Sequence, residues 1–440
     1  MAKIPPEWKL SQELLDPSWK DVTGIPERSG ILDEIELIIT KTDATGILAK
    51  VHSGQWTAYQ VTIAFCKRAA IAHQLVNCLM EICFDEAIEQ ARSQDNHFRQ
   101  TGGNTVGPLH GLPVSIKDHV SVAGLRSTLG YIAWADDIQA EDALYVKSLK
   151  QAGAIIFVKT TMPQTGMAIE TASNLWGRTT NGFNRDLVAG GSSGGDGALV
   201  GLFGAPVGIG TDVAGSIRVP CAFNGLYGIR PTVRRFSYEK IATALRGGRG
   251  IPAVIGPMVH SIRDIQLICD VQVAAAHWEE DPNVMRIPWN PRPILPNKLA
   301  IGLLTFDGVV MPHPPILRGL KEAAEKLRIA GHEVIEMAPY QQRRAWDLAV
   351  SFPRDVCRHH SYQRVQSSLY FATGGQEAKA QIAAGREPWF PAMEKLHCNP
   401  TVRERSAKEL YDVRSSPRLE LAGWSLTIVR RIASGRSGCL

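Results

Sequence analysis

The chain has 440 residues, of which 44% are hydrophobic and 21% are charged, and its mean hydropathy is −0.08. These values are typical of a globular protein and exclude collagen-like and largely disordered chains. Lys and Arg number 48 against 43 Asp and Glu, a formal net charge of +5. The basic excess is small and forms no stripe, so we expect no nucleic-acid partner.

The eight cysteines form no CxxC pair and no Cys/His group with metal-ligand spacing. We therefore expect reduced thiols and no metal site. His359 and His360 are interpreted as a surface pair, because the twelve histidines include no HExxH pattern. Neither a signal peptide nor a membrane span is predicted, since no apolar stretch follows the N-terminal basic residue. A cytoplasmic protein is the expectation.

Residues 1–30 are weakly periodic, and we expect residues 1–40 to form an arm over the surface. Apolar spacing after Thr57 predicts an amphipathic helix over 57–73, with Thr57 as its N-cap. A short apolar run then predicts a buried strand at 77–84, and helical spacing returns at 85–98.

The alternation of strands and helices continues along the rest of the chain. Further strands are predicted at 111–118, 154–159, 205–210, 299–305 and 332–337. Further helices are predicted at 141–152, 194–203 and 315–330. This order predicts an α/β fold, with one large domain over 41–413 built on a mixed, mostly buried β-sheet sandwiched between helices.

Two glycine- and serine-rich segments stand out, AGGSSGGDGALVG at 189–201 and GIGTDVAGSIRVP at 208–220. A phosphate-binding loop is disfavoured because GxxxxGK[ST] is missing and no lysine follows the glycines. Residues 190–194 formally satisfy GxSxG, the motif of a nucleophile elbow. That motif needs a strand directly before its serine, and residues 184–190 make a poor strand.

The same segments resemble the signature of the amidase family. The resemblance covers the sequence GLPVSIKD at 111–118. It also covers later segments at 190–195, 211–220, 224–232 and 256–264. Spacings of 24 residues between Ser192 and Ser216, and of 99 between Lys117 and Ser216, suit the family. The likeness runs from about residue 48 to residue 338, and it is closest to the fungal acetamidase branch.

The resemblance implies an amidase-signature fold and hydrolysis of a carboxamide to a carboxylic acid and ammonia or an amine, without a cofactor. Ser216 would attack the carbonyl carbon, Ser192 would pass its proton on, and Lys117 would be the terminal base. A lysine accepts a proton only when neutral, so its ordinary pKa of about 10.4 must fall, which burial achieves. Lys117 follows the apolar run 112–116. The alternative is an ordinary ion pair between Lys117 and Asp118.

The resemblance also implies a cis peptide bond between Gly191 and Ser192. It assigns the stabilisation of the oxyanion to successive backbone N–H groups, those of Val213, Ala214, Gly215 and Ser216. Position 214 is alanine where many family members have glycine, and a backbone donor survives that exchange.

Supporting roles are expected for three neighbours of the two serines. Ser193 would assist the relay through hydrogen bonds, and the opposite charges of Asp212 and Arg218 would brace the loop that carries Ser216. Tyr131 and Trp134 could line an acyl pocket, although packing in the core or on the surface explains these side chains equally well.

Chains of the acetamidase branch normally continue well past residue 440, and the likeness fades after the middle 300s. Residues 414–440 contain five arginines against one acid, and we expect them to form an atypical tail on a C-terminally shortened domain. Two alternatives to an active amidase therefore stay open, a non-catalytic amidase-like protein and an amidotransferase-type subunit. The expected partner is a small-molecule amide, and a homodimer is compatible with the resemblance.

Overall fold

The computed structural model describes residues 3–245, 251–288, 296–343, 370–398 and 402–410. Contacts divide the chain into two units, Met1–Pro291 with Glu377–Leu396, and Arg292–Gln376 with His397–Leu440. The first unit holds the large sheet and every site residue proposed from the sequence. The predicted tail at 414–440 and the pair His359 and His360 lie outside the described residues.

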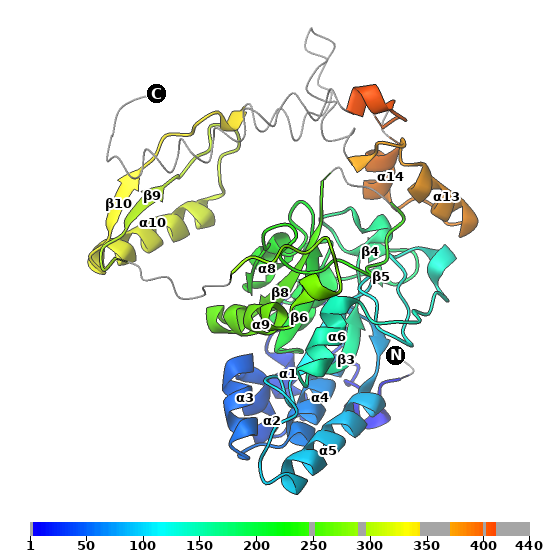
Figure 1. Ribbon diagram of the computed structural model, residues 1–440, viewed down its shortest axis with the longest axis vertical. Helices are drawn as coiled ribbons and strands as arrows, with labels where there is room; N and C mark the ends of the chain where they lie inside the picture. The colour runs from blue at the N-terminus through cyan, green and yellow to red at the C-terminus, as the bar shows by residue number, and fades with distance from the viewer. Residues whose placement is uncertain (1–2, 246–250, 289–295, 344–369, 399–401, 411–440) are drawn as a thin grey trace. The chain divides into compact units, whose positions relative to one another are not determined.

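The first unit is built on a six-stranded sheet with the order β1-β3-β2-β6-β8-β7 (Figure 1). Strand β2 runs parallel to β3 and β6, and the other neighbours pair antiparallel. Every residue of the first five of these strands is buried, so both faces of the sheet are covered. The strands are β1 (Leu79–Ile82), β2 (Pro113–Lys117), β3 (Ile155–Thr160), β6 (Val207–Asp212), β7 (Tyr227–Gly228) and β8 (Val254–Val259).

Helices pack on this sheet in two groups (Figure 1). Helix α4 (Ala58–Val76), α5 (Phe84–Gln100) and α7 (Gly194–Gly201) pack on β2, β3 and β6, whereas α9 (Ile262–Ala274) packs on β8 and on α6 (Leu144–Gln151). Thr57 caps α4 in a capping box with Gln60. The α/β class, the mixed buried sheet between helices and the Thr57 cap are confirmed.

The N-terminal segment is less extended than expected. It contains a 3₁₀ turn at Pro6–Trp8, α1 (Ile25–Arg28) and α2 (Glu34–Lys41), and α3 (Ala44–His52) follows. Several of its apolar side chains lie in the main core cluster, namely Ile4, Trp8, Leu10 and Val22. Burial of these side chains fixes the segment on the rest of the unit.

Strand β8 was not predicted, because its sequence VIGPMV contains Gly256 and Pro257, which are unusual inside strands. In the sheet, β8 pairs along its full length with β6, but β7 pairs only with Met258 and Val259. Pro257 therefore has a strand neighbour on one side only, which is the kind of position where a sheet tolerates proline.

The second unit contains β9 (Ala300–Leu303), α10 (Pro314–Ile329) and β10 (Glu333–Glu336), and its two strands are parallel. These elements match the predicted strand, helix and strand. The remaining elements are short: β4 (Ala172–Ser173), β5 (Gly177–Arg178), α8 (Arg218–Asn224), α13 (Gln376–Ala384) and α14 (Pro391–His397), with 3₁₀ turns at Ile132–Trp134, Gln164–Gly166 and His277–Glu279. No described helix combines the length and the apolar composition that crossing a bilayer requires.

Candidate active site

Lys117 ends β2, which lies between β3 and β6 near the middle of the sheet. Its side chain is 0% exposed. The Nζ atom lies 2.7 Å from Ser192 Oγ and 2.9 Å from Thr211 Oγ1. Burial lowers the pKa of Lys117 to about 7, against the opposing charges of three buried or partly buried aspartates. A large share of this amine is therefore neutral near pH 7.

Asp118 does not pair with Lys117, although it is the next residue. Its carboxylate accepts hydrogen bonds from the backbone N–H and the hydroxyl of Thr128 and from the backbone N–H of Leu129. Among the described residues, Lys117 forms no ion pair within the 4 Å that defines one. The alternative interpretation of Lys117 as an ordinary ion-pair partner of Asp118 is wrong.

The glycines before Ser192 are required by close packing of the backbone. A Cβ atom on Gly191 would lie 2.6 Å from the carbonyl oxygen of Ala168, and one on Gly190 would lie 2.9 Å from Pro220 Cα. Gly190 also has a φ of +84°, in the region that favours glycine. The peptide bond between Gly191 and Ser192 is cis, as the resemblance implied.

Ser216 lies in the loop between β6 and α8, and the side chain of Asp212 organises this loop. The Asp212 carboxylate accepts hydrogen bonds from the backbone N–H groups of Gly215 and Ile217, at 2.7 and 3.2 Å, and from two nitrogens of the Arg218 guanidinium. Burial alone would raise the pKa of Asp212, but these hydrogen bonds outweigh it and the pKa is lowered. Asp212 thus connects the turn at 215–217 to the Arg218 guanidinium.

Ser193 connects the two serine-bearing segments. Its backbone N–H donates to the carbonyl oxygen of Ser216 at 3.2 Å. Its hydroxyl donates to the Thr211 carbonyl oxygen and accepts from the Thr211 N–H, both at 3.3 Å. These contacts hold Ser216 beside the turn that carries Ser192, whose side chain already bonds Lys117.

Three of the four backbone N–H groups assigned to the oxyanion are available. Among the described residues, the amides of Val213, Ala214 and Ser216 have no acceptor, whereas the Gly215 amide donates to Asp212. The Gly215 amide is therefore already engaged in this structure, and its assignment to the oxyanion stays a prediction. The physical reason is the negative charge of Asp212, which attracts the nearest amide of the turn.

Three buried residues beside Lys117 were missed. Thr211 bonds Lys117 directly, and His119 bonds Thr211. Asp196 accepts from Ser115 Oγ at 2.8 Å and from a threonine of β3, and its burial raises its pKa to about 6. Thr211 lies within the TD motif and could have been suspected from it. Neither His119 nor Asp196 belongs to a pattern that the sequence reasoning could use.

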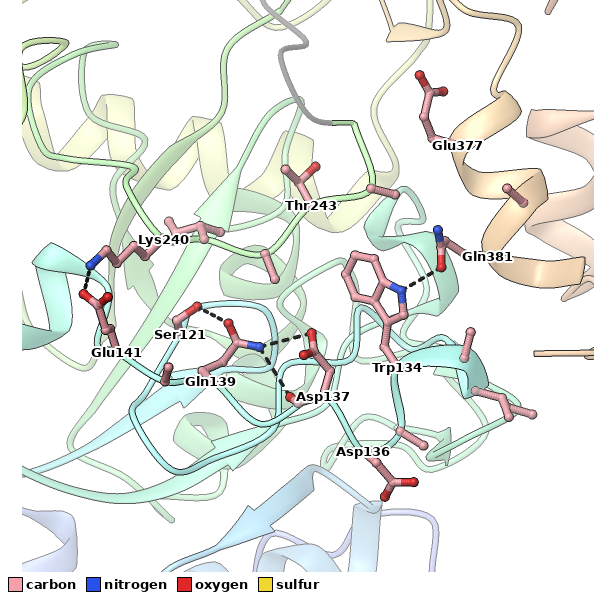
Figure 2. A pocket seen from close by; sticks show the side chains of 18 residues that line it. Ser121, Trp134, Asp136, Asp137, Gln139, Glu141, Lys240, Thr243, Glu377 and Gln381 are labelled. Carbon is pink, nitrogen blue, oxygen red and sulfur yellow. Dashed lines mark hydrogen bonds and ion pairs between the residues drawn. The ribbon is translucent and has the colours of Figure 1, made fainter. Parts of the chain in front are cut away.

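The described residues also line a cavity of about 1030 Å³ (Figure 2). The loops 132–141 and 240–244 line it together with α13. Trp134 is one of its walls and donates a hydrogen bond to Gln381, whereas Tyr131 is buried in a small core cluster. None of the catalytic residues proposed from the sequence lines this cavity, so we assign it no substrate. Trp134 thus lines a cavity, but its role in an acyl pocket stays a prediction, whereas the burial of Tyr131 agrees with packing in the core.

In the described part of the chain, no group of three or more His, Cys, Asp or Glu side chains is arranged to hold a metal ion. Among the described residues, Cys66, Cys78, Cys83, Cys221 and Cys269 are buried free thiols, and Cys398 is an exposed one.

The chain matches the family model Amidase over residues 60–402. The chain belongs to the amidase family. It is 41% identical over 416 residues to an acetamidase of Emericella nidulans, a match that covers 93% of this chain and 72% of that protein. It is 42% identical over 398 residues to an amidase of Gibberella zeae, with 89% and 69% coverage.

Comparison with solved structures gives the same result as comparison of the sequences. A fatty acid amide hydrolase superposes with a TM-score of 0.87 at 29% identity and covers 98% of this chain and 74% of that one. As a member of the amidase family, the protein is a hydrolase that acts on amide carbon–nitrogen bonds. The predicted family and enzyme class are confirmed.

Proposed function

We propose that this amidase hydrolyses a carboxamide through an acyl-enzyme on Ser216, with Ser192 and Lys117 as the proton relay. The hydrogen bond of 2.7 Å between Lys117 Nζ and Ser192 Oγ carries the proposal. It joins a hydroxyl to a buried amine whose pKa is lowered to about 7 by that burial. A serine hydroxyl needs such a base before it can act as a nucleophile.

In the proposed reaction, Ser216 Oγ attacks the amide carbon while its proton moves to Ser192 Oγ. The proton of Ser192 moves in turn to Lys117 Nζ. The amide N–H groups of Val213, Ala214 and Ser216 donate to the oxyanion. The C–N bond then breaks as the leaving nitrogen takes a proton back along the same path, and ammonia or an amine departs. Water attacks the acyl-enzyme by the same proton route and releases the carboxylic acid.

The name of the Emericella nidulans acetamidase makes acetamide the first substrate to test. Amides of increasing acyl length should follow, because the fatty acid amide hydrolase shares the fold. A cytoplasmic location, a homodimer and the absence of a nucleic-acid partner stay predictions from the sequence. The domain limits 1–40, 41–413 and 414–440 stay predictions as well.

A fluorophosphonate is expected to form one covalent adduct per chain, on Ser216. Mass spectrometry of the intact protein would count the adducts, and mapping of the peptides would locate them. Ser216→Ala should form none, and heat-denatured enzyme serves as the control for non-specific reaction. A folded wild-type protein that stays unmodified would favour the non-catalytic alternative. A protein that acts only together with a second subunit on glutamine would favour the amidotransferase alternative.

The rate of fluorophosphonate labelling is expected to rise with pH and then level off. The neutral form of Lys117 is the active base, so below its pKa of about 7 the rate should increase about tenfold per pH unit. Above about pH 8 the rate should be constant. Rates measured from pH 5 to 9 in one mixed buffer of fixed ionic strength check this. A profile that is flat from pH 5 to 9 would remove Lys117 as the base.

A further inference from the structure

His119 lies two residues after Lys117, and its imidazole is buried. Its Nδ1 atom is 3.1 Å from the carbonyl oxygen of Ala242, and its Nε2 atom is 2.8 Å from Thr211 Oγ1. The backbone of Ala242 is itself fixed, because its N–H donates to the His119 carbonyl oxygen at 2.8 Å and the flanking residues Val120 and Ile241 form an antiparallel bridge. The ring is therefore held on both sides.

These contacts determine which nitrogen of the ring carries hydrogen. A carbonyl oxygen can only accept a hydrogen bond, so Nδ1 must be the donor to Ala242. Burial also lowers the pKa of His119 well below its ordinary value, which favours the neutral ring. In a neutral imidazole with hydrogen on Nδ1, Nε2 can only accept. Its partner Thr211 must then be the donor in the bond between them.

The direction of the hydrogen bond between Thr211 and His119 determines the direction of the bond between Lys117 and Thr211. Thr211 has one hydroxyl hydrogen, which His119 takes, so its oxygen can only accept from Lys117. A neutral lysine amine has two hydrogens and one lone pair. With one hydrogen directed at Thr211, the lone pair is free for the proton of Ser192, whose oxygen lies 2.7 Å away. Without His119, Thr211 could turn its hydrogen onto that lone pair and compete with Ser192.

We propose that His119 is a positioning residue that acts through Thr211 to keep the lone pair of Lys117 directed at Ser192. This inference rests on the proposed serine–lysine relay and adds a side chain that does not touch the substrate. The charged groups that influence Lys117 are Asp118, Asp196 and Asp212, and those that influence His119 are Lys117 and Lys159. Thr211 also has a side-chain hydrogen bond with Tyr238, whose pKa is raised by burial, so Tyr238 stays uncharged near neutral pH. His119→Phe changes none of these charges.

His119→Phe and Thr211→Val are each expected to slow fluorophosphonate labelling of Ser216 by about 10- to 100-fold, by analogy with the loss seen when an outer-shell partner of a metal ligand is removed. The double variant should be no slower than the slower single variant, because His119 acts only through Thr211. Thr211→Ser should recover most of the rate lost in Thr211→Val. In His119→Phe the pH midpoint should also fall, since a hydrogen bond donated by Thr211 favours the neutral amine.

Additive losses in the double variant, or an unchanged midpoint in His119→Phe, would contradict the inference. His277→Phe is the matched control, because it removes another buried imidazole, whose hydrogen bonds within the described part of the chain go to Ser148 and Ser237 and not to the relay. It should leave the midpoint unchanged.

The ring hydrogen can also be observed directly. The ¹⁵N chemical shifts of His119 should show a protonated Nδ1 and an unprotonated Nε2 across pH 5 to 9. A ring protonated on Nε2 would overturn the inference even if labelling of Ser216 proceeds as proposed. A wild-type protein that is never labelled would overturn the relay itself and, with it, the role assigned to His119.

Discussion

Lys117→Met is expected to lower kcat/KM for amide hydrolysis by about 10⁴-fold or more, because members of a nucleophile relay fail as a unit when one is removed. The same variant should be more stable than the wild type at pH 7. Folding places Lys117 in a site that lowers its pKa from 10.5 to about 7. At about 1.4 kcal/mol per pKa unit, the protein gives up several kcal/mol of stability to keep this amine buried.

The dependence of this difference on pH follows from the direction of the shift. Between about pH 7 and 10.5 the unfolded chain binds more protons at Lys117 than the folded chain does, so wild-type stability rises with pH in this window. Methionine binds none. The advantage of Lys117→Met should therefore be full near pH 7 and below, and should shrink toward pH 10.5.

Some of this gain is lost because Ser192 and Thr211 lose a hydrogen-bond partner, at about 1 kcal/mol each. We expect a net gain of about 2 kcal/mol at pH 7, measured by denaturant unfolding at several pH values. Lys159→Met is the matched control, since Lys159 is also 0% exposed but burial lowers its pKa less, to about 8, and its charge offsets that of Asp118. Its removal should therefore stabilise the protein less than Lys117→Met does. The prediction would be contradicted if Lys117→Met were less stable than the wild type by the same amount at pH 7 and at pH 10. Burial would then not disfavour the charged form of Lys117.

Ser216→Ala is expected to reduce kcat/KM by about 10⁴- to 10⁶-fold, and Ser192→Ala by a factor of the same order, since each removes the whole relay. The double variant should be no less active than the slower single one. Initial rates of acetamide hydrolysis at pH 8, followed by ammonia release, would measure the three variants against buffer alone.

Ser193→Ala is the matched control for Ser192→Ala, because the two serines are adjacent and both are buried. The side chain of Ser193 bonds only to the backbone of Thr211 among the described residues. A loss of about tenfold is expected for Ser193→Ala, from weaker positioning of Thr211. If the losses of Ser192→Ala and Ser216→Ala multiply in the double variant, the two hydroxyls do not share one proton path.

The elements of the sheet core could be predicted because their patterns are unambiguous. The apolar runs before Lys117 and before Lys159 have the length and bounds of buried strands, and both became neighbours in the sheet. Thr57 and Gln60 form a capping box that is visible in the sequence. The glycines around Ser192 could be connected to Ser216 and Lys117 only through the spacing typical of a family.

The partners of Lys117 could not be predicted in the same way. Whether Lys117 bonds Asp118 or Ser192 depends on which way the strand presents alternate side chains, and therefore on the fold. His119 has no pattern in the sequence, because its function arises from contacts with Thr211 and Ala242, which lie 92 and 123 residues away. Asp212 is close to Gly215 in sequence, yet its preference for that amide is a property of the turn's geometry.

The parallel ladder of β2 beside β6 brings Lys117 and Thr211 to the same edge of the sheet. Both side chains belong to strands, whereas Ser192 and Ser216 belong to the connections that leave that edge. In the proposed relay, the terminal base thus lies on a strand, whereas both hydroxyls lie in connections. Under that proposal, substitutions elsewhere in those connections would alter which amide is accepted while leaving the base on the strand unchanged.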